Sequence, residues 1–384
     1  MKKTAISLLL AVVMVFSLVL VAAPAAQATT HTHCVCNGAT IHSAASHTCD
    51  ATTTYTALDQ ATASAIAPED ASAELLVYPL QGTYYLTENV SFNGRIKFTG
   101  DLTICLNGFK LQCADTRFGD AGFTVNITDC SAGQTGELSS NSTLVQMFFY
   151  PTSKAAAVNV WGGNIKSSAD GSQGCVFRVG NEAHALNIYG GTIHGSNAGV
   201  KSGTAGQGGA IRASASAQVN MYGGTITGGK AITNASGAAK GGNVYIGGGI
   251  FSLYGGTITG GSVEGEGALG GNICLNSGSL KIYGGTITGS TSADGLYVAG
   301  GKLTIDTLDS TVKFEIKEDY NTEENLTIGT GVKLTNEGNL YTAAKKSAGG
   351  NANTGDSANL VVMGLGLVLG VAGMACLLPK KQKV

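Results

Sequence analysis

The feature that most constrains this chain is a glycine-rich heptapeptide that returns at nearly regular intervals. Tyr-Gly-Gly-Thr-Ile-Thr-Gly begins at Tyr222, Tyr254 and Tyr283, a variant begins at Tyr189, and a weaker copy begins at Trp161. The intervals are 28 residues (161 to 189), 33 (189 to 222), 32 (222 to 254) and 29 (254 to 283). A unit of this length cannot bury its apolar face alone, so it must stack on its neighbours. The sequence therefore predicts a repeat protein.

Strand-like pieces fill each repeat between glycine-rich corners. In one repeat the three pieces are residues 243–246, 251–254 and 257–259. Side chains alternate between the two faces of a strand, so every second residue is expected to point inward. The expected inward positions form two columns: Val158, Val160, Leu186, Ile188, Val219, Met221, Phe251, Leu253, Leu280 and Ile282, and then Ile165, Ile193, Ile226, Ile258 and Ile287.

Three short strands in each repeat resemble the rungs of the pectate-lyase-like family of right-handed parallel β-helices. The resemblance covers roughly residues 80–340 and implies an all-β solenoid, which we assign to residues 75–340. A β-propeller is the rival architecture, but its blades contain four strands and about 40 residues. Residues 341–354 follow as a linker of small residues, suited to a tether.

Both ends of the chain carry targeting patterns. Lys2 and Lys3 precede an apolar run over residues 5–23, and small residues end at Ala28, so residues 1–28 are expected to be a cleaved signal peptide. At the other end, an apolar run over residues 360–378 is followed at once by lysines. Such a run is long enough to cross a bilayer, with the lysines on the cytoplasmic side. Residues 355–384 are therefore expected to contain a transmembrane anchor helix.

The segment before this apolar run is similar to the cell-wall sorting signal of Gram-positive surface proteins. That signal reads Leu-Pro-x-Thr-Gly, and here Thr354 and Gly355 match it, while Asn351 and Ala352 stand at the Leu and Pro positions. The resemblance implies sortase-catalysed attachment to peptidoglycan. Without cleavage, the apolar span would hold the protein in the membrane. Both routes place a secreted protein on the extracellular surface, anchored to the cell wall or to the membrane.

A histidine- and cysteine-rich head is expected over residues 29–74. Imidazole and thiolate groups are the usual zinc ligands. The alternative is a flexible head whose cysteines form disulfides or stay free, because Cys34 and Cys36 are closer together than zinc ligands usually are. The candidate metal ligands are His31, His33, Cys34, Cys36, His47 and Cys49, and zinc is the only cofactor that the sequence indicates.

Five further cysteines lie in or beside strand-like runs: Cys105, Cys113, Cys130, Cys175 and Cys274. Export would permit disulfides. A free cysteine also packs as a small hydrophobic residue, and this role is the one expected for these five.

One aromatic residue stands at the same place in five repeats, directly after an inward position, so the five are expected to form an outward column. Aromatic faces suit the apolar faces of sugar rings, which makes a glycan platform one interpretation. The other is an aromatic ladder that stacks on itself and covers the corner. The candidate ligand-binding residues are Trp161, Tyr189, Tyr222, Tyr254 and Tyr283.

The distribution of charge argues against catalysis and against nucleic acid as a partner. The formal net charge is −2, and no basic face for phosphate is evident. Glycosidases need two carboxylates that flank the bond. Between residues 158 and 300 the acids are Asp170, Glu182, Glu264, Glu266 and Asp294, and no two neighbouring repeats place them at matching positions.

The sequence therefore favours a surface-displayed protein that is adhesin-like or structural. Its expected ligand is a glycan or another host or cell-wall component, bound without catalysis. The alternative is a carbohydrate-active β-helix enzyme of the polysaccharide lyase or glycoside hydrolase type. No catalytic residues are assigned.

Overall fold

The computed structural model describes residues 31–36, 39–40, 51–118, 122–140, 156–167, 175–180, 184–199, 205–233, 237–289 and 295–346, with side chains from residue 55 onward. Strands account for 55% of the described residues and helices for 4%, so the all-β class is confirmed. The expected signal peptide, the anchor segment, Thr354 and Gly355 lie outside the described residues. Within the described part, neither helix has the length or apolar character needed to cross a membrane.

The first strands lead into the stack. They are β1 (His31–Cys36), β2 (Ala39–Thr40), β3 (Ala51–Leu58), β4 (Val77–Leu86), β5 (Val90–Ser91), β6 (Arg95–Cys105), β7 (Lys110–Cys113), β8 (Thr116–Phe118), β9 (Thr124–Thr128) and β10 (Glu137–Ser140), with the helix α2 (Gln60–Ala65) after β3. Strand β3 already pairs in parallel with β4, and Leu58 belongs to the continuous core. The parallel stack therefore begins within residues 51–58, earlier than the strand pattern of the sequence indicates.

The regular repeats occupy the middle of the chain. Their strands are β11 (Ala156–Val160), β12 (Asn164–Ser167), β13 (Phe177–Val179), β14 (His184–Ile188), β15 (Thr192–His194), β16 (Asn197–Ala198), β17 (Ile211–Ser214), β18 (Gln218–Met221), β19 (Thr225–Thr227), β20 (Lys230–Ile232), β21 (Val244–Leu253), β22 (Thr257–Thr259), β23 (Ser262–Glu264), β24 (Ile273–Ile282) and β25 (Thr286–Thr288). We call each repeat a rung.

The last strands close the stack with an antiparallel arrangement. They are β26 (Leu296–Val298), β27 (Lys302–Ile305), β28 (Val312–Ile316), β29 (Leu326–Ile328), β30 (Val332–Glu337) and β31 (Leu340–Lys345), with the short helix α3 (Thr322–Asn325) before β29. Strand β31 pairs antiparallel with both β28 and β30, whereas the strands of the regular rungs pair in parallel.

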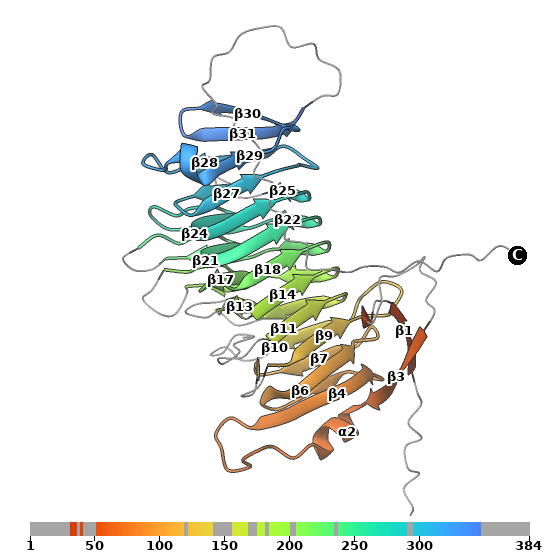
Figure 1. The fold of residues 1–384 in the computed structure, drawn as a ribbon. Helices are drawn as coiled ribbons and strands as arrows, with labels where there is room; N and C mark the ends of the chain where they lie inside the picture. Colours follow the sequence, from red (N-terminus) through yellow and green to blue (C-terminus); the bar gives the residue numbers. More distant parts are fainter. Residues whose placement is uncertain are drawn as a thin grey trace, which may run out of the picture. The chain divides into compact units, whose positions relative to one another are not determined.

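Successive rungs place equivalent strands side by side (Figure 1). One parallel sheet runs β25-β22-β19-β15-β12-β10-β7-β5, a second short sheet runs β16-β20-β23, and the remaining strands form a large 20-stranded sheet. This arrangement is consistent with a β-helix or solenoid. The short sheet was not among the three expected pieces, and the first two pieces of the later rungs merge into the single strands β21 and β24.

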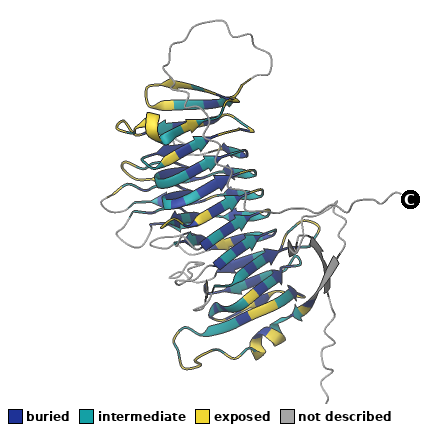
Figure 2. Cartoon of the chain, viewed as in Figure 1, coloured by how far each residue is buried: buried dark blue, intermediate teal, exposed yellow. Residues whose placement is uncertain are grey.

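The two predicted inward columns are confirmed, because every residue assigned to them is buried. They belong to one continuous hydrophobic core that extends from Leu58 to Ala343. Figure 2 shows mostly buried and intermediate positions along the stacked strands, with single exposed positions among them, and more exposed positions at α2 and near β30. Alternation along each short strand therefore determines which side chains face outward and can form a site.

The two glycines of the heptapeptide are required for different structural reasons. A Cβ on Gly223 would lie 2.5 Å from the carbonyl oxygen of Tyr189 in the preceding rung, so the first glycine is required by close approach. Gly224 has a φ of +78°, which side chains rarely adopt, and its Cβ would lie 2.7 Å from the carbonyl oxygen of Gly191. These glycines let the corners pack directly on one another and fix where the aromatic residues stand.

Candidate ligand-binding site

The five predicted aromatic residues form one stacked column on the outside of the large sheet. Trp161 and Tyr189 lie with ring centroids 3.8 Å apart and planes inclined by 7°. Tyr189, Tyr222, Tyr254 and Tyr283 continue the column at centroid spacings of 5.0, 4.9 and 5.0 Å. The expected outward column is therefore present, and its members stack on one another as one of the two interpretations requires.

This stacking limits what the column can offer a ligand. Tyr189, Tyr222 and Tyr254 each have a ring neighbour on both faces, yet 38%, 45% and 43% of their surfaces remain exposed. The exposed parts are consequently ring edges and phenol hydroxyls. A sugar cannot insert between these rings, so a ligand of the column would meet its edge.

A row of asparagines runs beside the aromatic column. Asn159, Asn187 and Asn220 precede Trp161, Tyr189 and Tyr222 by two residues, so both rows share the outward face of their strands. Each asparagine amide donates to the Oδ1 of the previous rung: Asn159 to Asn126 at 2.9 Å, Asn187 to Asn159 at 2.9 Å and Asn220 to Asn187 at 3.0 Å. We call the two rows together (Asn159, Asn187, Asn220, Trp161, Tyr189, Tyr222, Tyr254 and Tyr283) the Tyr–Asn face.

The Tyr–Asn face is uncharged at neutral pH. Burial raises the pKa of Tyr189, Tyr222 and Tyr283, and the neighbouring tyrosines add to the effect at Tyr222. Their hydroxyls stay protonated and can both donate and accept hydrogen bonds. The phenol hydroxyl therefore recurs in each rung from Tyr189 to Tyr283, whereas the asparagine row ends at Asn220 and is followed in register by Ser252 and Lys281.

The eight-stranded sheet presents a second outward face with a charged end. The Oε2 of Glu137 lies 2.6 Å from the Nζ of Lys166, and its Oε1 lies 3.2 Å from the Nζ of Lys110. Burial opposes ionisation of Glu137, but the bonds to Lys166, Ser139 and Lys110 outweigh it and lower its pKa. A carboxylate held ionised in this way is not suited to donate a proton to a leaving group.

His194 stands on the same face, one rung beyond Lys166. Its Nε2 lies 3.1 Å from the Oδ1 of Asn164. Partial burial and the charge of Lys166 lower its pKa, so the imidazole is neutral at pH 7. Further along, the face becomes two rows of threonines, Thr192, Thr225, Thr257 and Thr286 beside Thr227, Thr259 and Thr288.

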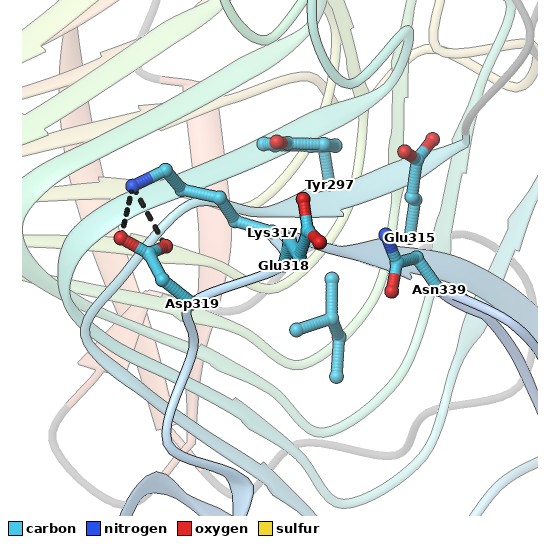
Figure 3. A pocket seen from close by; sticks show the side chains of 7 residues that line it. Tyr297, Glu315, Lys317, Glu318, Asp319 and Asn339 are labelled. Carbon is cyan, nitrogen blue, oxygen red and sulfur yellow. Dashed lines mark hydrogen bonds and ion pairs between the residues drawn. The ribbon is translucent and has the colours of Figure 1, made fainter.

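A pocket of about 520 Å³ lies near the C-terminal end of the stack (Figure 3). Its lining residues are Tyr297, Glu315, Ile316, Lys317, Glu318, Asp319 and Asn339. Lys317 turns toward Asp319, with its Nζ 2.7 Å from the Asp319 carboxylate. The acids considered for catalysis lay between residues 158 and 300, so this group was missed, although the run Glu315-Ile-Lys-Glu-Asp319 is visible in the sequence.

Two of the five acids considered for catalysis lie within the described residues. Glu264 pairs with Lys230 on the neighbouring strand, and Glu266 is exposed. Asp170, Glu182 and Asp294 lie outside the described residues.

The side chains of the candidate zinc ligands lie outside the described residues. His31, His33, Cys34 and Cys36 lie on β1, before the residues whose side chains are described, and His47 and Cys49 lie outside the described residues. Elsewhere in the described part, no three His, Cys, Asp or Glu side chains gather closely enough to hold a metal ion.

Comparisons of the chain with protein-family models, with curated proteins and with solved structures gave no significant match. The fold itself defines the class: an all-β protein of stacked parallel sheets, consistent with a β-helix or solenoid. Its outward faces carry in-register rows of similar side chains, among them the aromatic and asparagine rows of the Tyr–Asn face.

Proposed function

We propose that this chain is a surface-displayed, right-handed parallel β-helix protein, adhesin-like or structural, that binds a neutral glycan along its Tyr–Asn face without catalysis. The observation that carries the proposal is the repetition of the same uncharged groups in register, with ring centroids 4.9 to 5.0 Å apart from Tyr189 to Tyr283. A linear polymer of hydroxyl-rich units laid along the stack would meet phenol hydroxyls at the four rungs from Tyr189 to Tyr283, with asparagine amides beside Tyr189 and Tyr222.

The energetics favour a polymer over a small sugar. A single hydrogen bond contributes about 0.5–1.5 kcal/mol, which is too little for specific binding of one unit. Several rungs acting on one chain would add their contributions, because later contacts form within the same complex. Uncharged groups also match a neutral polysaccharide better than an acidic one.

A glycan array with the full-length chain tests this proposal, combined with assays for reducing sugar and for unsaturated products. The informative variant is Tyr222→Phe/Tyr254→Phe, because it removes two hydroxyls and keeps both rings in the column. We expect about tenfold weaker binding, which corresponds to roughly 1.4 kcal/mol. The matched control, Thr225→Val/Thr257→Val on the eight-stranded sheet, should bind as the wild type does. Equal binding by the tyrosine variant would exclude the Tyr–Asn face.

The proposed location is the outer surface of a Gram-positive cell. Support comes from the signal-peptide pattern of residues 1–28, the apolar run of residues 360–378 and the Thr354-Gly355 pair. Protease treatment of intact cells should remove the protein. Replacing Thr354 by Ala distinguishes the two anchors, because it should release the protein from the wall fraction if sortase uses this site and leave its distribution unchanged if the membrane span holds it.

Zinc in the head is a separate proposal, supported by the four candidate ligands of β1 and by His47 and Cys49. Metal analysis of the purified chain should find one zinc per chain, and Cys34→Ser/Cys36→Ser should lose it. Absence of zinc from the wild type would leave the disulfide or free-thiol alternative, and retention of zinc by the variant would exclude Cys34 and Cys36 as its ligands.

The second candidate function is a carbohydrate-active enzyme, and the pocket near β28 favours it. The pocket carries two acids, Glu315 and Glu318, besides the Asp319 that pairs with Lys317. Two carboxylates are the minimum that a glycosidase needs. If the array assays release product, Glu315→Gln and Glu318→Gln should abolish it, whereas the Tyr222→Phe/Tyr254→Phe variant should leave the chemical step intact.

A further inference from the structure

Two cysteines from adjacent rungs touch each other near the start of the stack. Cys105 is the last residue of β6, and Cys130 follows the end of β9 by two residues. The two sulfur atoms lie 3.2 Å apart, although the residues are separated by 25 positions in the sequence. The sequence predicted that each would be a small core residue. It did not predict that the two would contact each other.

The contact is held from both sides by the backbone around it. The amide of Leu106, next to Cys105, donates to the carbonyl oxygen of Thr128 at 2.8 Å. The buried carboxylate of Asp129 then joins the two turns: it accepts from the amide of Gly108 at 2.9 Å and from the amide of Ser131 at 3.0 Å. The residues that flank each cysteine are therefore fixed relative to one another.

The two thiols differ in access and in proton affinity. Cys105 is fully buried and packs against Tyr55 and Tyr85, whereas Cys130 is partly exposed. Cys105 donates its S–H to the sulfur of Cys130, and this bond lowers the pKa of Cys130 while it raises that of Cys105. Cys130 is thus the thiol that is both reachable and more readily ionised, which are the two requirements for attack on a disulfide.

We propose that Cys105 and Cys130 form a reversible thiol–disulfide site, which links two rungs covalently when the chain meets a low-molecular-weight disulfide such as glutathione disulfide. The Cys130 thiolate attacks one sulfur of the reagent, forms a mixed disulfide and releases one glutathione thiolate. Cys105 then attacks the sulfur of Cys130, the bond between Cys130 and glutathione breaks, and the proton of Cys105 passes to the departing glutathione thiolate. Two protein thiols are oxidised and one glutathione disulfide is reduced to two thiols.

The geometry requires little movement for this reaction. A disulfide bond is about 2.05 Å long, so the sulfurs would approach each other by roughly 1 Å from their contact distance. Cys113 is a nearby cysteine with which the Cys105–Cys130 pair can be compared. It is fully buried one strand further on, and its sulfur donates to the carbonyl oxygen of Ser139 at 3.9 Å.

Peptide mapping of the full-length chain tests the proposal without any variant. Trypsin cuts after Lys97, Lys110, Arg117 and Lys154, so Cys105, Cys113 and Cys130 fall in the separate peptides 98–110, 111–117 and 118–154. After incubation of the folded protein with glutathione disulfide, we expect peptides 98–110 and 118–154 to be joined and lighter by two hydrogens, and dithiothreitol to separate them. Recovery of both peptides unlinked, with free or singly glutathionylated thiols, would overturn the proposal.

Variants then test the order of the two steps. Cys105→Ala should accumulate the mixed disulfide on Cys130, because the resolving thiol is missing, and Cys130→Ser should give no adduct at Cys105 in the folded protein. Cys113→Ser is the control and should form the linked peptides as the wild type does. If glutathione accumulates on Cys105 rather than on Cys130, the assignment of the attacking thiol is wrong.

Discussion

The side-chain amide of Asn243 donates a hydrogen bond of 2.8 Å to the Oδ1 of Asn272, and both residues are completely buried. Each asparagine also accepts from a corner amide of the preceding rung, Asn243 from Gly229 at 2.7 Å and Asn272 from Gly261 at 2.9 Å. The amide of Asn243 also donates to the carbonyl oxygen of Thr259, and the amide of Asn272 donates to that of Thr288. Two buried side chains thus satisfy the backbone of successive corners.

Replacing Asn272 by Ala should therefore destabilise the stack. The change leaves the amide of Gly261, the carbonyl of Thr288 and the side-chain amide of Asn243 without their partner, and each unsatisfied buried group costs about 1–3 kcal/mol. We expect a loss of roughly 3 kcal/mol in urea denaturation. Asn220→Ala, in the partly exposed row, is the control and should lose less than about 1 kcal/mol. Equal losses would show that burial of the asparagine is not what matters.

The paired glycines give a second prediction. Gly223→Ala places a methyl group 2.5 Å from the carbonyl oxygen of Tyr189, which is backbone and cannot turn away, so the two rungs must separate. We expect a loss of about 2–3 kcal/mol, in the range of overpacked positions. Gly331→Ala is the matched control, because nothing lies within 4 Å of the added methyl group. A neutral Gly223→Ala would mean that the corners are looser than the contact distance indicates.

Alkaline pH should weaken the fold through its tyrosines. The pKa values of Tyr189, Tyr222 and Tyr283 are raised by burial, and burial raises that of Tyr320 to about 12. An unfolded tyrosine ionises near pH 10, so the folded chain holds its protons more tightly. The stabilisation is complete below about pH 10 and is lost as the pH rises toward 12.

Tyrosinate absorbance measures this directly. The titration of the folded chain should lie at higher pH than that of the chain in urea, and the urea midpoint should fall between about pH 10 and 12. Tyr320 donates its hydroxyl to the carbonyl of Asn325 at 2.8 Å, and Tyr320→Phe should remove the most alkaline part of the titration. Coincident titrations of the folded and unfolded chains would refute the expected linkage.

The periodic features of this fold could be predicted from the sequence because they are local. Alternation along a strand places Ile226 inward and its neighbours outward without any knowledge of the partner strand. The repeat interval then aligns equivalent positions, so the aromatic column from Trp161 to Tyr283 can be predicted from the spacing of the repeats.

The remaining features depend on contacts between residues whose positions are not related by the sequence repeat. Asn243 is a polar residue at the start of a strand-like piece, and its burial is explained only by its hydrogen bonds with Gly229 and Thr259. Cys105 and Cys130 lie in the irregular early rungs, where the sequence gives no register between them. The acidic pocket likewise forms where the antiparallel β31 brings Asn339 beside β28, and the repeat does not extend that far.

The pair of Arg95 and Asp115 gives the last prediction. The Nη2 of Arg95 lies 2.6 Å from the Oδ2 of Asp115, whose side chain is only 2% exposed, and a second bond joins Nε to Oδ1. Arg95→Ala leaves this buried carboxylate without its ion-pair partner. The free energy of unfolding should fall by about 3–5 kcal/mol in urea denaturation. Lys97→Ala, on the same strand, breaks a pair with Glu69 that is partly exposed and should cost less than about 1 kcal/mol. Because the cost arises from the unpaired charge, the double variant Arg95→Met/Asp115→Leu should recover most of the loss, and failure to recover it would point to lost packing instead.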